Sequence, residues 1–141
     1  MRLALLAALL VPLATTAALA QNVMQERRAL MKEIGDDTKV AAAMMKGETP
    51  YDAAKAAAIF KDYAADAEKF GTLFPEGSNV GETKAAPALW TDRAGFDAAL
   101  AKFKADIAAN ADKVGTPDGL KTAMAAVGSN CRACHQSYTQ R

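Results

Sequence analysis

The two cysteines and the single histidine of this 141-residue chain lie within five consecutive residues, as Cys131, Cys134 and His135. Two thiols three positions apart, followed directly by an imidazole, are typical of covalent haem attachment: the thiols form thioethers with two vinyl groups, and the imidazole ligates the iron. On a helix, positions i, i+3 and i+4 share one face, so all three side chains can address one haem. The pattern therefore predicts one covalent haem c per chain, held by Cys131 and Cys134, with His135 as a metal ligand.

Three other uses of the cysteines fit the chain less well. A thioredoxin-like redox pair sits near a βαβ pattern, and no segment of this chain has the pattern of a strand. A structural zinc ion needs four ligands, so a carboxylate or a second chain would have to complete a site made by these three residues. A disulfide within one helical turn would strain the S–S geometry and leave His135 without a role. The haem interpretation is therefore the one that uses all three residues.

Residues 1–20 differ in composition from the rest of the chain. A basic residue precedes an apolar stretch at residues 3–13, and small residues form an A-x-A ending at residues 18–20. This order is typical of a secretory signal peptide, so we expect cleavage after Ala20, a mature domain at residues 21–141 and a periplasmic location. An uncleaved membrane anchor is the alternative, but a proline and two threonines in the segment argue against a membrane span. Export also suits the haem pattern, because bacterial haem c attachment takes place outside the cytoplasm.

Charge and residue types exclude several classes of partner and reaction. The chain has 17 basic and 16 acidic residues, and no basic run that could follow a phosphate backbone, so we expect no nucleic-acid partner. No second histidine is present for acid–base work, and no polar group that oxygen chemistry at a haem needs is evident. We therefore do not expect an enzyme.

Strong helix formers dominate after residue 20, and alternating runs of β-branched residues are missing, which predicts an all-α chain. Apolar and small residues recur every three or four positions in four segments, at about residues 22–46, 50–71, 92–114 and 116–138. Four helices of similar length with mostly short connections are expected to pack as an antiparallel up-down bundle. The sequence therefore predicts a single four-helix-bundle domain that carries covalent haem c.

Capping residues indicate where these helices begin and end. Gly47 stands where a C-terminal cap would follow the first segment, and Thr116 stands as an N-cap before a proline. Residues 72–87, which begin with a run of helix breakers, are expected to form a long loop. Gly35 is the residue that weakens the prediction for the first helix, since glycine disfavours helix interiors.

Several stretches of the mature chain resemble the class II c-type cytochromes, the family of cytochrome c′ and the low-spin cytochrome c-556 proteins. The similar stretches are residues 27–32, 46–52, 73–77, 81–85 and 87–90, together with the C-terminal haem pattern. A haem pattern near the C-terminus distinguishes this family from the common cytochromes c, which carry it near the N-terminus. The resemblance implies the same four-helix fold with one haem.

The resemblance also implies three further site residues by their positions. Arg27 matches a first-helix arginine beside a haem propionate, and Met31 matches the residue that faces the distal side of the iron. Thr83, in the loop before the third predicted helix, matches a further haem neighbour. The family usually has Arg or Lys four residues after the haem histidine, whereas this chain has Thr139, so a positive charge near the proximal ligand is missing.

Two functions are compatible with such a site. With Met31 bonded to iron opposite His135, six-coordinate haem suits an electron carrier between redox partner proteins, and we expect this function because thioether sulfur is a competent iron ligand. With five-coordinate iron, the protein would instead bind a diatomic gas such as nitric oxide. Met31 as a core methionine that fills a gap between apolar side chains is the structural alternative. The sequence leaves open whether the bundle forms a homodimer.

Overall fold

The computed structural model describes residues 12–79, 81 and 83–140, with side chains from residue 20 onward. The first eleven residues of the predicted signal peptide lie outside the described residues. The described chain is helical, and its one β-type contact is an isolated bridge between Ala85 and Thr139. The helices are α1 (Pro12–Lys46), α2 (Ala53–Gly71), the short α3 (Ala88–Thr91), α4 (Arg93–Asn110), the 3-10 turn η1 (Ala111–Lys113) and α5 (Pro117–Tyr138). The all-α prediction is confirmed.

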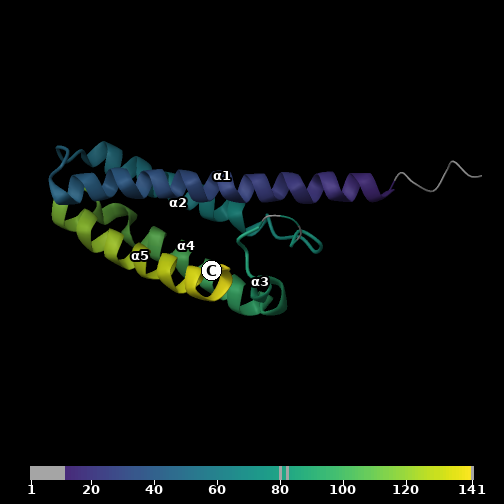
Figure 1. The fold of residues 1–141 in the computed structure, drawn as a ribbon. Helices are drawn as coiled ribbons and strands as arrows, with labels where there is room; N and C mark the ends of the chain where they lie inside the picture. The colour runs from purple at the N-terminus through teal and green to yellow at the C-terminus, as the bar shows by residue number, and fades with distance from the viewer. Residues whose placement is uncertain (1–11, 80, 82, 141) are drawn as a thin grey trace, which may run out of the picture.

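The four long helices form the predicted up-down bundle (Figure 1). Helix α1 contacts α2, α2 contacts α4, α4 contacts α5, and α5 contacts α1, which closes a ring of four helices. Helices that follow one another along the chain are therefore neighbours in space, as short antiparallel connections require.

Side-chain and glycine caps fix the helix ends at the predicted places. The Asp52 carboxylate accepts a hydrogen bond from the Lys55 N–H (3.0 Å), and the Thr116 hydroxyl accepts one from the Gly119 N–H (3.1 Å). Each of these bonds satisfies a backbone donor that the first helical turn leaves unpaired. After α1, Gly47 has a φ of 74°, the left-handed conformation that glycine adopts without steric cost. The predicted caps at Gly47 and Thr116 are confirmed.

The structure differs from the sequence prediction at two elements. Helix α1 begins at Pro12 rather than near residue 22, because the alanines and leucines of this region favour helix and nothing interrupts them. Its first turns extend beyond the rest of the bundle (Figure 1). The short α3 lies between the predicted loop, which ends at residue 87, and the third predicted helix, and it was not predicted because four residues are too few to show a helical period. None of the described helices combines the length and the apolar character that crossing a membrane requires.

The two ends of the bundle are packed differently. One end of the bundle contains the connections from α1 to α2 and from α4 to α5. There the helices enclose a continuous core that includes Met44, Phe60, Val114 and Leu120, and we call this the packed end. Leu120 has no exposed surface, and Phe60 and Val114 are 1% exposed. The opposite end holds the haem pattern near the end of α5, and we call it the cavity end.

Candidate functional site

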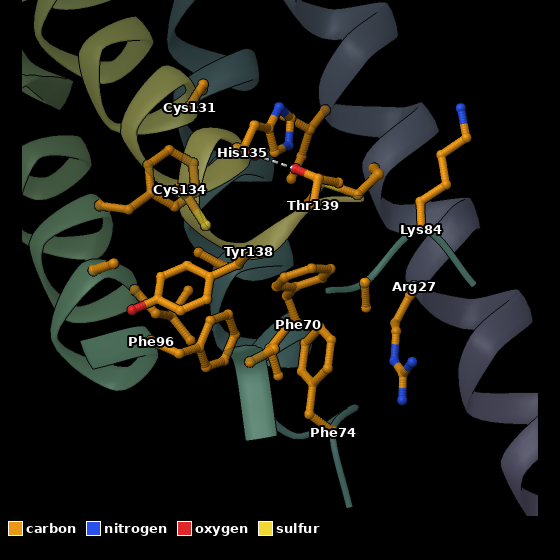
Figure 2. Close-up of a pocket in the computed structure, with 18 of the residues that line it drawn as sticks. Arg27, Phe70, Phe74, Lys84, Phe96, Cys131, Cys134, His135, Tyr138 and Thr139 are labelled. Atoms are coloured by element: carbon orange, nitrogen blue, oxygen red, sulfur yellow. Dashed lines mark hydrogen bonds between the residues drawn. The ribbon is translucent and has the colours of Figure 1, made fainter. Parts of the chain in front are cut away.

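A cavity of about 670 Å³ opens at the cavity end, between all four long helices and the loop that precedes α3. Its walls are mostly apolar, with aromatic rings from α2, α4 and α5 and from the loop (Figure 2). The residues that the sequence singles out come from three separate parts of the chain. All six of them line this cavity: Arg27, Met31, Thr83, Cys131, Cys134 and His135.

The α5 wall carries the haem pattern. Cys131 and Cys134 are half-buried free thiols, and His135 is exposed at the next position of the same helix. Burial raises the pKa of both thiols above the ordinary value, so both stay protonated at neutral pH. Two thiols and an imidazole thus share one helical face at the mouth of an apolar cavity.

The end of α5 is anchored directly after this pattern. The Ala86 N–H donates to the Tyr138 carbonyl (2.9 Å), and the Gln140 N–H donates to the Lys84 carbonyl (2.8 Å). The Tyr138 hydroxyl also donates to the carboxylate of Asp92, which caps α4 (2.9 Å). These bonds hold the last turn of α5, and with it His135, against the loop and α4.

Thr139 occupies the place where the family usually has a basic residue. Its hydroxyl donates to the backbone carbonyl of His135, as Figure 2 shows. The side chain therefore satisfies a carbonyl that the helix end would leave unpaired. At this position the chain has a neutral hydrogen-bond donor in place of a positive charge.

The α1 wall faces the cavity with side chains spaced three and four residues apart. Met24 and Met31, two turns apart, are half-buried and line the cavity. Met31 also packs against the buried core that continues toward the packed end. The structure thus brings a thioether from α1 and the imidazole of His135 from α5 to one cavity, which is the arrangement that the predicted iron ligation requires.

Arg27 has contacts that the sequence did not reveal. Its guanidinium donates to the Leu73 carbonyl (2.6 Å), to the Ser78 carbonyl (3.0 Å) and to the Ser78 hydroxyl. It also lies over the Phe74 ring, 4.4 Å from the centroid, and is 5% exposed. Burial lowers its pKa, but a guanidinium remains charged at neutral pH. Arg27 therefore fastens the loop after α2 to α1, and Figure 2 shows the guanidinium turned away from His135.

The charges around the cavity are of one sign. Arg27, Arg28 and Lys84 line it, and no carboxylate is present among the described lining residues. Thr83, next to Lys84, is half-buried, and its hydroxyl accepts from the Ala85 N–H (3.1 Å). The cavity therefore suits a flat apolar group that carries negative charge at its edge.

These features fit a haem. The volume lies within the range of about 300–1,000 Å³ that is common for cofactor sites. The donor set consists of two free thiols at i and i+3 and an imidazole at i+4, with a thioether on another helix, and the basic residues offer partners for propionates. The apolar, partly open walls leave room for a macrocycle between α1 and α5.

The sequence did not reveal that aromatic side chains form a wall of the cavity and contact one another there. Phe70, Phe74 and Phe96 pack edge to face, with centroids 4.9 and 5.0 Å apart, and Phe96 continues to Tyr138 at 5.6 Å. Such pairs add specific attraction to their burial. A periodic apolar pattern shows that these rings face inward, but it does not distinguish a cavity wall from a filled core.

Comparisons with known proteins show which family this chain is similar to. A family model described as cytochrome C′ matches residues 22–139. A cytochrome c′ of Rhodopseudomonas palustris is 36% identical over 140 residues, which cover 98% of this chain and 95% of the relative. A cytochrome c-556 of Agrobacterium fabrum is 38% identical over 120 residues, which cover 84% of this chain and 82% of the relative. The solved structure of a cytochrome c′ from Rhodopseudomonas palustris superposes with a TM-score of 0.80 at 35% identity, covering 84% of this chain and 96% of that one.

Proposed function

This chain belongs to the cytochrome c′ family of monohaem cytochromes, which includes relatives named cytochrome c-556, and within that family we propose that it carries single electrons. The observation that supports this proposal is that Met31 of α1 and His135 of α5 line the same cavity. Met31 and His135, from different helices, would both be available as ligands to the iron of a bound haem. Ligation by His and Met suits one-electron transfer.

Each residue of the site has a role in this proposal. Cys131 and Cys134 would hold the haem through thioethers, His135 and Met31 would ligate the iron, and the haem would supply a reversible one-electron change. The anchored end of α5 holds the backbone that carries His135 against the loop and α4. Near the mouth, Lys84 and Arg28 are placed to attract propionates. Arg27, whose guanidinium is bonded to the loop, would contribute a positive charge on the propionate side of the haem, and Thr83, which lines the same cavity, would be a further neighbour of the haem.

We also propose that the mature protein is periplasmic and begins at Gln21. The family match begins at residue 22, one residue after the predicted start of the mature chain at Gln21. N-terminal sequencing of protein recovered from its native host tests this proposal. A retained Met1 would contradict release into the periplasm.

The iron ligand is tested by a matched pair of methionine substitutions. Met31→Ala should convert a low-spin haem spectrum to high-spin and should open the iron to carbon monoxide. Met24→Ala is the control, because Met24 lines the same cavity from the same helix, two turns earlier. It should leave the spin state unchanged. Optical spectra of the oxidised and reduced proteins, with and without carbon monoxide, provide the measurement.

Two results would overturn the Met31 bond. A wild-type protein that is high-spin in both redox states and lacks a sulfur-to-iron charge-transfer band would make gas binding the better interpretation. A change of spin state in Met24→Ala but not in Met31→Ala would show that Met24, and not Met31, is the iron ligand.

A further inference from the structure

Gly35 lies in the interior of α1, where glycine is the least favoured residue apart from proline. It is half-buried and lines the cavity, four residues after Met31 and three residues before Thr38. Positions with these spacings share one helical face. The cavity-facing side of α1 therefore bears side chains at Met31, Ile34 and Thr38, and position 35, beside Ile34, lacks one.

Neither the backbone nor the packing of the protein requires this glycine. The described glycines with positive φ are Gly47, Gly77 and Gly81, so Gly35 has an ordinary helical conformation. A Cβ at Gly35 would meet no heavy atom within 4 Å, whereas a Cβ at Gly71 would lie 2.8 Å from a Leu100 methyl carbon. Alanine at position 35 should therefore favour the helix, by about fivefold in the folding equilibrium constant, as long as the cavity is empty.

The turn of α1 that contains Gly35 is also held in place. The Thr38 hydroxyl donates to the Ile34 carbonyl (2.7 Å), and the hydroxyl oxygens of Thr38 and Tyr63 lie 2.7 Å apart. Ile34 is 8% exposed and Tyr63 is 1% exposed. Because α2 anchors this turn through Tyr63, α1 cannot easily shift to make room for an added group.

We propose that Gly35 is a positioning residue at which the haem lies directly against the backbone of α1. Without a side chain there, the macrocycle can approach the helix closely enough for the Met31 sulfur, one turn earlier, to reach the iron. A methyl group at this position would hold the haem and α1 apart. The part of this proposal that concerns sulfur rests on the proposed iron ligation, whereas the close contact between haem and Gly35 does not.

A pair of glycine substitutions in the haem-loaded protein tests this proposal. Gly128 is the matched control, because it also lies half-buried within a long helix, α5, and a Cβ there would meet no heavy atom within 4 Å, but it does not line the cavity. Gly128→Ala should raise Tm by about 4 °C through helix propensity and should leave the haem spectrum unchanged. Gly35→Ala should lower Tm below that of wild type, weaken the sulfur-to-iron band and increase carbon monoxide affinity at least tenfold.

The outcomes separate this proposal from the proposed ligation. If Gly35→Ala gains as much in Tm as Gly128→Ala and keeps the wild-type spectrum, the proposal is overturned even where Met31 is the ligand. If the wild-type haem is high-spin, the Met31 ligation fails, and the proposal is then judged by Tm and by the position of the main haem absorption band. A lower Tm and a displaced band in Gly35→Ala, with neither in Gly128→Ala, support it in that case as well.

Discussion

The packed end and the cavity end are built by the same four helices, and they differ in what joins those helices. At the packed end the connections are short, and one of them, between α4 and α5, spans only residues 114–116 after η1. At the cavity end, residues 72–87 and α3 lie between α2 and α4, and the end of α5 is hydrogen-bonded to this connection. Short turns draw the helices together over Phe60 and Leu120, whereas the long connection supplies part of a cavity wall. Helices of similar composition thus form a filled core or a cofactor site according to how their ends are connected.

This contrast has an energetic consequence. Buried side chains at the packed end stabilise the fold through contacts within the protein. Cavity-end residues such as Met31, Leu100 and Phe103 stay half-buried, so part of their apolar surface lacks a partner in the chain. A bound haem would supply that partner and stabilise the folded state by binding to it. We therefore expect the two ends to respond differently to loss of haem and to loss of apolar volume.

The largest effect is expected from removing both thiols. A Cys131→Ala/Cys134→Ala variant should lack covalent haem, and its intact mass should equal that of the mature chain alone. Amide hydrogen exchange should become roughly 100-fold faster near the haem pattern and near Met31, and should change little at the packed end. The single variant Cys131→Ala serves as control, because Cys134 can still form one thioether. Equal loss of protection at both ends would show that the bundle unfolds as one unit without haem.

Leucines at the two ends should respond differently to truncation. Leu120→Ala at the packed end should lower the free energy of unfolding by about 3 kcal/mol, because it leaves a cavity in a closed core, and should leave the haem spectrum unchanged. Leu100→Ala, on the cavity wall, should cost about 1 kcal/mol and should alter the spectrum, since its side chain faces the haem site. Denaturant unfolding and optical spectra measure both effects. If Leu120→Ala changed the spectrum as much as Leu100→Ala does, the two ends would not be independent.

The smallest effect concerns a carboxylate buried beside the core. Asp66 on α2 is 8% exposed, and its Oδ2 atom has no hydrogen-bond partner among the described residues. Burial, together with the nearby carboxylates of Glu33 and Asp37, raises its pKa above the ordinary value of 3.8. Because the folded state binds this proton more tightly than the unfolded state, the ionised group destabilises the fold at neutral pH. This cost disappears as pH falls through the raised pKa.

Asp66→Asn should therefore raise the free energy of unfolding by about 1 kcal/mol at pH 7. The advantage over wild type should shrink as the pH falls toward the ordinary aspartate value. Thermal unfolding of both proteins at several pH values measures this difference. Asp112→Asn is the control, because Asp112 is exposed and is not among the groups that raise the pKa of Asp66. A constant difference at every pH would mean that titration of Asp66 is not its cause.

Residues close together in the chain account for what the sequence predicted well. The cap at Thr116 depends on a donor three residues away, and the i, i+3 and i+4 spacing of Cys131, Cys134 and His135 depends on one helical turn. These relations hold wherever the helix lies in the fold. The helix type, the positions of the main breaks and the composition of the haem pattern could therefore be predicted before the structure was known.

The contacts of Arg27 show what only the tertiary structure decided. Its bonds to Leu73 and Ser78 join residues 46 and 51 positions apart, and they direct the guanidinium toward a loop rather than toward His135. The cavity likewise depends on the connection between α2 and α3, which supplies part of its wall. It also depends on the hydrogen bonds that join the end of α5 to Lys84 and Ala86. By itself the sequence determined four amphipathic helices and a haem pattern, because those follow from neighbours along the chain. Whether the helices close on one another or leave a cavity depends on contacts between distant segments, which exist only once the chain has folded.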